Sequence, residues 1–264
     1  MHCTNRWPVH DAMKRGFEMV ATTFLETEQG RSLAYHKTEG AGPMVVFLGG
    51  LKSDMEGSKA VHLETWAKEQ GRGFLRFDYS GHGESSGIFT DGCIGDWFED
   101  TLAAVDQLAE GPLVIVGSSM GGWQALLLAR ARPERIKGMV TIAAAPDFTE
   151  DGYWASFTDA QRTALNEVGY VELPSDYMEP YVITRRMIED GRKQLVLRAP
   201  LALNFPTRFL QGTEDTAVSV ETALRLFNHV TGGDITLEIC KGKDHRFSDD
   251  DCLKTIIRRV IAVS

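Results

Sequence analysis

A serine lies between an apolar run and a helical pattern near the middle of this chain of 264 residues. Residues 113–116 are apolar, Gly117-Ser118-Ser119-Met120-Gly121 follows, and residues 124–130 have the composition of a helix. A buried strand, a sharp turn and a helix in this order form a nucleophile elbow, whose strained turn raises the serine hydroxyl above the sheet. Gly117 and Gly121 fit such a turn because strand and helix approach too closely there for a Cβ atom. The pattern predicts Ser119 as the nucleophile of acyl transfer.

Two features of the chain offer alternatives to this interpretation. The turn at Ser119 could join strand and helix without any chemistry, and a second Gly-x-Ser-x-Gly occurs at residues 83–87. That copy is separated from its nearest predicted strand by residues 78–82, and no helical pattern follows it. Only the copy at residues 117–121 has the strand–turn–helix context that the motif requires. The loop that contains His82 and Ser85 is therefore interpreted as structural support for the elbow, and His82 is kept as a candidate for lining the mouth of the site.

A serine hydroxyl is a weak nucleophile near pH 7 and needs a base that is oriented by an acid. At a nucleophile elbow the expected chain order is serine, acid, histidine. Asp215 follows a predicted strand at residues 205–212, with Glu214 as the less favoured alternative, and His245 follows the last predicted strand at residues 235–240. None of the six other histidines follows a late strand. Asp215 and His245 are therefore the predicted acid and base, and the alternative for His245 is an exposed loop histidine.

The oxyanion that develops during acyl transfer needs backbone N–H donors. One is expected from Met120, the residue after the nucleophile, and the other from Leu51, in the loop after a strand at residues 44–48. Gly49-Gly50 precedes Leu51, and Gly50 is predicted to let the backbone approach the substrate closely. One such donor typically contributes about 3 kcal/mol to transition-state stabilisation.

The elements that must position these residues alternate between strand and helix. An edge hairpin is expected at residues 22–38, strands at 44–48, 73–78, 113–116, 136–143, 205–212 and 235–240, and helices at 57–70, 95–109, 124–130, 220–230 and 250–263. Short apolar strands that alternate with helices predict an α/β protein. We expect a mostly parallel eight-stranded sheet with helices on both faces, in a single domain over residues 1–264.

The alternation breaks between about residues 147 and 204, where no core strand is recognisable. This segment is interpreted as a small helical cap inserted over the carboxyl ends of the strands, where such sheets place their sites. Seven aromatic residues fall within it: Phe148, Tyr153, Trp154, Phe157, Tyr170, Tyr177 and Tyr181. Any one of them could simply pack the cap onto the sheet. A small cap has too little interior to bury them all, so some, with Trp154 as a candidate, should line a cleft over Ser119 and bind substrate.

The composition limits the classes of partner. A formal net charge of −9 argues against nucleic acid or an anionic membrane as the main partner. No apolar stretch reaches the length of a membrane span, and the first residues lack the apolar core of a signal peptide, so a cytoplasmic location is expected. The four cysteines have neither metal-ligand nor redox spacing. No metal and no cofactor are predicted, and the oligomeric state stays open.

Four segments together carry a family resemblance: Phe77-Asp78-Tyr79-Ser80-Gly81, Gly117-Ser118-Ser119-Met120-Gly121-Gly122-Trp123, Ala131-Arg132-Pro133-Glu134 and Asp244-His245-Arg246. From about Leu33 to the C-terminus the chain resembles the mitochondrial palmitoyl-protein thioesterases of the abhydrolase-domain group, also described as acyl-glucuronide esterases. The resemblance includes Gly49-Gly50 where His-Gly is commoner. It implies an α/β-hydrolase fold, a triad of Ser119, Asp215 and His245, and hydrolysis of acyl thioesters or esters. The missing targeting sequence indicates a bacterial relative.

The residues and the resemblance lead to one expected function. We expect a serine hydrolase that cleaves carboxylic esters or acyl thioesters, of small molecules or acylated proteins, through an acyl-enzyme. Other classes remain open. The chain could be a non-catalytic ligand-binding protein that has kept the fold, since fold does not imply function. It could also be a peptidase, a lactonase or a carbon–carbon bond hydrolase that uses the same three residues.

Overall fold

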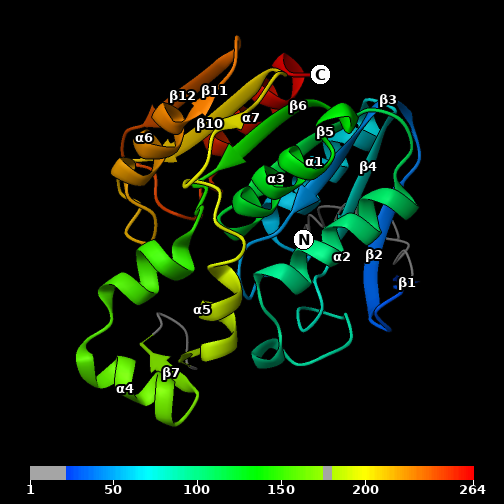
Figure 1. Ribbon diagram of the computed structural model, residues 1–264. Helices are drawn as coiled ribbons and strands as arrows, with labels where there is room; N and C mark the ends of the chain where they lie inside the picture. Colours follow the sequence, from blue (N-terminus) through cyan, green and yellow to red (C-terminus); the bar gives the residue numbers. More distant parts are fainter. Residues whose placement is uncertain (1–21, 175–179) are drawn as a thin grey trace, which may run out of the picture.

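An eight-stranded sheet forms the centre of the computed structural model, which describes residues 22–174 and 180–264 (Figure 1). The strand order is β1-β2-β4-β3-β5-β6-β10-β12. The strands are β1 (Thr23–Glu26), β2 (Ser32–Thr38), β3 (Ala41–Leu48), β4 (Arg72–Phe77), β5 (Leu113–Ser118), β6 (Ile136–Ile142), β10 (Thr207–Gly212) and β12 (Ile235–Cys240). From β4 to β12 neighbouring strands are parallel, while β2 is antiparallel to both β1 and β4. The expected mostly parallel eight-stranded sheet is confirmed.

Helices cover both faces of this sheet. They are α1 (Ser58–Glu69), α2 (Ile94–Leu108), α3 (Met120–Ala131), α6 (Val220–His229) and α7 (Asp250–Ala262). One core contains apolar residues of α2, α3 and α6, and the other contains those of α1 and α7. Alternate side chains of β5 enter opposite cores, with Leu113 and Ile115 in the first and Val114 and Val116 in the second. Because β5 is buried on both faces, its sequence is a continuous apolar run.

The predicted elements agree with the observed ones to within a few residues at most ends. The largest difference along the sheet is at β3, which begins at Ala41 and not at Met44. Its start is irregular, since Gly42 has a φ of 75° and the register with β4 shifts between Ala41 and Val45. The apolar pattern identifies only the regular, buried part of this strand. No helix among the residues that the structure describes is long and apolar enough to cross a membrane.

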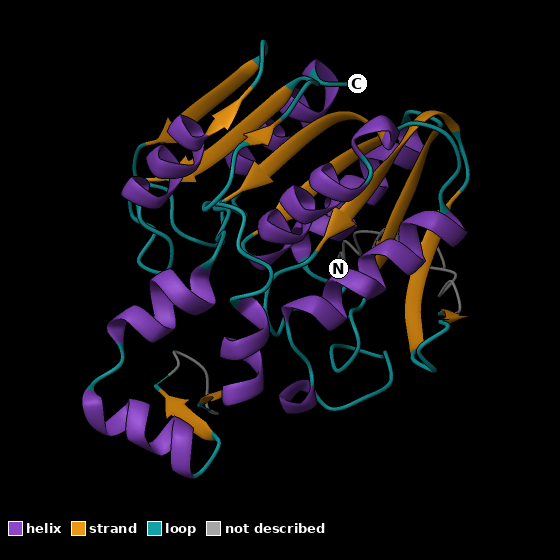
Figure 2. Cartoon of the chain, viewed as in Figure 1, coloured by secondary structure: helices purple, strands orange, loops and turns teal. Residues whose placement is uncertain are grey.

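The segment between β6 and β10, which we call the cap (residues 147–204), lies beyond the carboxyl ends of the parallel strands (Figure 2). It contains the π-helical turn η3 (Thr149–Trp154), α4 (Asp159–Glu167), β7 (Tyr170–Leu173), β8 (Tyr181–Thr184), α5 (Arg185–Gly191) and β9 (Leu201–Ala202). Strands β7 and β8 form an antiparallel pair separate from the main sheet, and β9 pairs with β11 (Val230–Thr231). The cap is therefore not helical throughout, although none of its short strands joins the main sheet. Four-residue strands are too short to show a period in the sequence.

Candidate active site

Ser119 lies at the sharp turn between β5 and α3, with φ 56° and ψ −118°. Its backbone N–H donates to Ile142 O at 2.9 Å, and its carbonyl accepts from the N–H groups of Gly122 and Ala145 at 2.9 and 3.1 Å. These bonds hold a positive φ that a non-glycine residue rarely adopts. A Cβ added to Gly121 would lie 2.0 Å from Leu48 O, and one added to Gly117 would lie 2.3 Å from Gly121 O. The close approach of strand and helix expected from the two glycines is observed.

Ser119, His245 and Asp215 form one hydrogen-bonded row, although 126 residues separate the serine from the histidine. His245 Nε2 lies 3.1 Å from Ser119 Oγ, and His245 Nδ1 lies 3.0 and 2.9 Å from the two carboxylate oxygens of Asp215. The loop after β12 carries His245, and the loop after β10 carries Asp215. Glu214 is exposed, and Asp215 occupies the position against His245. The structure thus brings together the three residues that the chain order selects.

The carboxylate of Asp215 accepts hydrogen bonds from several donors around it. Its Oδ1 accepts from the N–H groups of Ala217 and Val218 at 2.9 and 2.8 Å, and its Oδ2 accepts from Gln211 Nε2 at 3.0 Å. Burial of the carboxyl raises its pKa, but the hydrogen bonds from His245, Val218 and Gln211 outweigh burial, and the pKa lies below its ordinary value. Asp215 is therefore held ionised beside the imidazole. The sequence did not identify Gln211, because no motif marks its amide.

The predicted oxyanion donors lie on either side of Ser119. Met120 begins α3, and Leu51 follows the two glycines after β3; both residues line the same cavity as Ser119 and His245. Within the described residues, neither backbone N–H donates to a protein acceptor. A Cβ added to Gly50 would lie 3.4 Å from Ser119 Cβ, so Gly50 lies directly against the serine. The assignment of Leu51 and Met120 as oxyanion donors stays a prediction, and both residues lie in the wall of the cavity that contains Ser119.

A cavity of about 240 Å³ opens over Ser119. Its lining includes Leu51, Ser119, Met120, Ala145, Phe148, Gly152, Tyr153, Tyr181, Ala217, Val218 and His245. Phe148, Tyr153 and Tyr181 are the cap rings in this wall, whereas Trp154, Phe157 and Tyr170 are not part of it. Tyr177 lies outside the described residues.

The structure does not bring Trp154 into the cavity wall. Its ring centroid lies 4.6 Å from the Arg192 guanidinium and 5.3 Å from that of Arg162, so it packs against cations of the cap. The neighbouring Tyr153 takes the place in the wall that we expected for Trp154. The two residues follow each other in η3, whose π-helical turn is wider than an α-helical one and changes which neighbours share a face.

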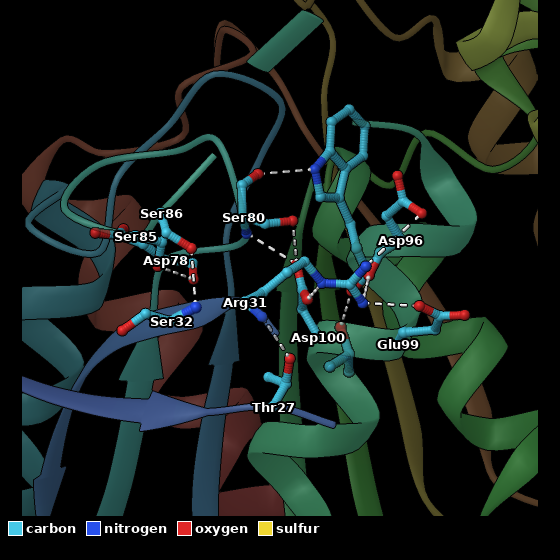
Figure 3. A network of polar contacts seen from close by, with 12 residues as sticks. Thr27, Arg31, Ser32, Asp78, Ser80, Ser85, Ser86, Asp96, Glu99 and Asp100 are labelled. Atoms are coloured by element: carbon cyan, nitrogen blue, oxygen red, sulfur yellow. Dashed lines mark hydrogen bonds and ion pairs between the residues drawn. The ribbon is translucent and has the colours of Figure 1, made fainter. Parts of the chain in front are cut away.

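A polar network ties the loop at residues 78–86 to α2 and to the edge hairpin (Figure 3). Asp100 accepts from the N–H and the hydroxyl of Ser80 at 2.8 and 2.7 Å, and pairs with Arg31 at 2.7 Å. Ser85, the serine of the second Gly-x-Ser-x-Gly, donates to Asp78 O and accepts from the Ala34 N–H. These contacts agree with the interpretation of this loop as structural support.

His82 is buried next to this network. Its Nδ1 lies 3.2 Å from Ser80 O, and the rings of Tyr79, Phe89 and Trp97 pack edge-on against its own. Burial lowers the pKa of His82. It is therefore a neutral packing residue and does not line the cavity over Ser119. In the described ranges, no group of three His, Cys, Asp or Glu side chains is placed to hold a metal ion.

Comparisons with known proteins identify relatives over most of the chain. Residues 45–252 match the Alpha/beta hydrolase family. The chain is 34% identical to Palmitoyl-protein thioesterase ABHD10, mitochondrial, of Rattus norvegicus, over 86% of this chain and 77% of the relative. A protein of known structure from Agrobacterium vitis S4 has 37% identity and a TM-score of 0.88, covering 92% of this chain and 98% of that one. Mouse alpha/beta hydrolase domain-containing protein 10 has 30% identity and a TM-score of 0.85, with coverage of 92% and 98%.

Proposed function

Because the chain belongs to the alpha/beta hydrolase family, we propose that it is a serine hydrolase that cleaves carboxylic esters or acyl thioesters. The observation that carries this proposal is the hydrogen-bonded row in which His245 Nε2 lies 3.1 Å from Ser119 Oγ and Asp215 lies 2.9 Å from His245 Nδ1. Nucleophile, base and orienting acid at these distances constitute the machinery of acyl transfer.

The proposed reaction has two halves. Ser119 Oγ attacks the carbonyl carbon while His245 Nε2 takes the hydroxyl proton, and the N–H groups of Leu51 and Met120 stabilise the oxyanion. His245 then gives the proton to the departing alcohol or thiol, which leaves an acyl group on Ser119. Water, deprotonated by His245, releases the carboxylic acid and restores the serine. Asp215 keeps the proton on Nδ1 throughout, so that Nε2 can act as a base.

The wall of the cavity supports a hydrocarbon acyl group in the proposed substrates. Phe148, Tyr153, Met120 and Leu51 give it a largely apolar wall, which favours a hydrocarbon chain over a polar one. The rat relative is named a palmitoyl-protein thioesterase, which is a hydrolase of a long acyl chain on a thiol. We therefore include acyl thioesters, of small molecules or of acylated proteins, among the proposed substrates.

Labelling with a fluorophosphonate tests the proposal, because the reagent phosphonylates only a serine that has been activated. The parent protein should be labelled at one site, and Ser119→Ala should lose both the label and the turnover of p-nitrophenyl esters. Ser85→Ala is the matched control, since Ser85 is the serine of the other Gly-x-Ser-x-Gly, and it should keep the label. Label that persists in Ser119→Ala would contradict the assignment.

The acid and the base are tested by kinetics. Asp215→Asn or His245→Ala should lower kcat by several orders of magnitude, while a triple variant should lose little more than Ser119→Ala alone, because the three residues act as a unit. A folded parent protein that takes up no label and hydrolyses neither esters nor thioesters would instead indicate a ligand-binding protein on the same fold.

A further inference from the structure

Lys52 lies at the rim of the candidate active site, directly after the predicted oxyanion donor Leu51. Its φ is 56°, a conformation that is uncommon for a residue with a side chain. The ammonium lies 5.1 Å from the ring centroid of Tyr181 in β8 and 5.4 Å from that of Phe89 in η1 (Phe89–Asp91). Tyr181 is part of the cavity wall. Two aromatic faces therefore hold this cation beside the opening of the cavity.

The charge of Lys52 is not neutralised by the described residues around it. The side chain is exposed, and no ion pair joins it to a carboxylate in the described part of the chain. Among the residues that the structure describes, no Asp or Glu lines the cavity over Ser119. The aromatic contacts position the ammonium without cancelling its charge, so it can attract an anion from solvent. In a chain with a formal net charge of −9, this is a local positive charge against Tyr181, a residue of the cavity wall.

We propose that Lys52 is a specificity-determining residue that favours substrates whose leaving group carries a negative charge. The proposal rests on the proposed hydrolase function. An anionic group on the acyl side would have to enter the apolar wall formed by Phe148 and Tyr153, where it would lose its hydration. We place the leaving group towards Tyr181, the part of the cavity wall that Lys52 contacts, where an anionic substituent can remain hydrated and approach the ammonium.

Two thioesters of equal length test the proposal. Both carry an octanoyl group, one on 2-mercaptoethanol and the other on 2-mercaptoethanesulfonate, so that they differ in the charge of the leaving group. The quantity measured is the ratio of kcat/KM for the anionic thioester to that for the neutral one. Comparing this ratio between variants cancels the difference in thiol reactivity.

Replacing Lys52 should change this ratio in a graded way. Lys52→Met should lower it about threefold, the size expected for two unit charges roughly 6 Å apart in a water-like dielectric, and Lys52→Glu about tenfold. Lys52→Arg keeps the charge and the stacking and should preserve the ratio. Lys137→Met removes the same charge from an exposed position at the far end of β6 and is the matched control. Added salt should reduce the preference of the parent.

The outcomes separate this inference from the proposed function. An equal loss on both thioesters in Lys52→Met would overturn charge selection and leave Lys52 as a residue that only orders Tyr181. A preference that appears with an ω-carboxylated acyl chain, and not with the sulfonate, would overturn the assignment to the leaving group. If the parent hydrolyses neither thioester, the proposed function itself fails.

Discussion

The side-chain amide of Gln211 ties the candidate acid to the strand that carries it. Its Nε2 lies 3.0 Å from Asp215 Oδ2 and 2.8 Å from Val218 O, and the side chain is fully buried. Gln211→Met keeps the volume and removes the Nε2 group, so that Asp215 Oδ2 loses one of its partners and Val218 O loses this donor. We expect this variant to lose about 1–3 kcal/mol of stability and about tenfold in kcat/KM, because Asp215 would orient His245 less firmly.

Gln211→Met should also have a pH signature in thermal melts. Burial raises the pKa of Asp215, and the hydrogen bonds, including that from Gln211, lower it below 3.8. A carboxyl whose folded-state pKa is depressed stabilises the protein above its unfolded pKa, and this stabilisation is lost as pH falls through the folded value. The stability gap between parent and variant should therefore be full at neutral pH and narrow below about pH 4. Glu214 is exposed, so Glu214→Gln is the control and should change neither the activity nor the melting temperature. A stability difference between parent and Gln211→Met that does not depend on pH would argue against a hydrogen bond from Gln211 to the ionised Asp215.

The sequence predicts some of these residues better than others, for physical reasons. Ser119, Asp215 and His245 can be placed because each follows a strand and the carboxyl ends of parallel strands meet at one edge. Gln211 cannot, because its role depends on the direction of one amide within a buried strand. Tyr153 and Trp154 could not be told apart, since the wide turn of η3 decides which of the two rings faces the cavity.

At the scale of elements, α5 connects the cavity wall to the body of the fold. Asp190 Oδ2 accepts from the Gly95 N–H at 2.6 Å in the first turn of α2, whose N-cap residue Cys93 makes no side-chain cap bond. On its other side α5 packs closely on η3, because a Cβ added to Gly191 would lie 2.1 Å from Thr149 Oγ1. Asp190 thus caps the N-terminus of α2 and holds α5, the helix against which η3 with Tyr153 packs.

Asp190→Ala should weaken this connection. We expect a loss of about 0.5–2 kcal/mol, typical of a lost N-cap acceptor. The melting temperature should fall by roughly 2–4 °C per kcal/mol. The kcat/KM for octanoyl esters should drop more than that for acetyl esters, because only the longer chain reaches η3. Asp190→Asn keeps an acceptor oxygen and should retain most of the stability and most of the kcat/KM for octanoyl esters. Arg186→Ala removes a half-exposed ion pair with Asp96 and should lower stability and kcat/KM less than Asp190→Ala does. A larger effect of Arg186→Ala would assign the anchoring of α5 to the ion pair and not to the bond between Asp190 and Gly95.

Element-level prediction succeeded for the sheet and failed for part of the cap. The inner strands β4, β5 and β6 are short, largely apolar and separated by helices, so their burial on both faces is visible in composition alone. Strands β7 and β8 have only Val171 and Ile183 fully buried and lie next to Pro174 and Pro180, so their sequences resemble loops. Their pairing comes from contact with each other within the cap, which a local pattern does not report.

For the whole molecule, acyl selectivity arises where the core and the cap meet. The body of the fold supplies Leu51 and Met120 to the cavity wall, while the cap supplies Phe148, Tyr153 and Tyr181. The cavity volume of about 240 Å³ is limited, so an acyl chain gains by burial only until the space is filled. The dependence of kcat/KM on acyl-chain length therefore reports the shape of the cavity that the body and the cap form together.

We expect kcat/KM to rise from acetyl to medium-chain esters and thioesters, since each buried methylene contributes up to about 0.8 kcal/mol, and to fall once the chain reaches the end of the cavity. Tyr153→Ala enlarges the cavity and should move the maximum to longer chains. Trp154→Ala is the matched control, because this ring packs against Arg162 and Arg192 and should leave the maximum in place. Chains of two to sixteen carbons cover the range. A flat or steadily falling profile in the parent would mean that the cavity binds no acyl chain and that small esters are the substrates.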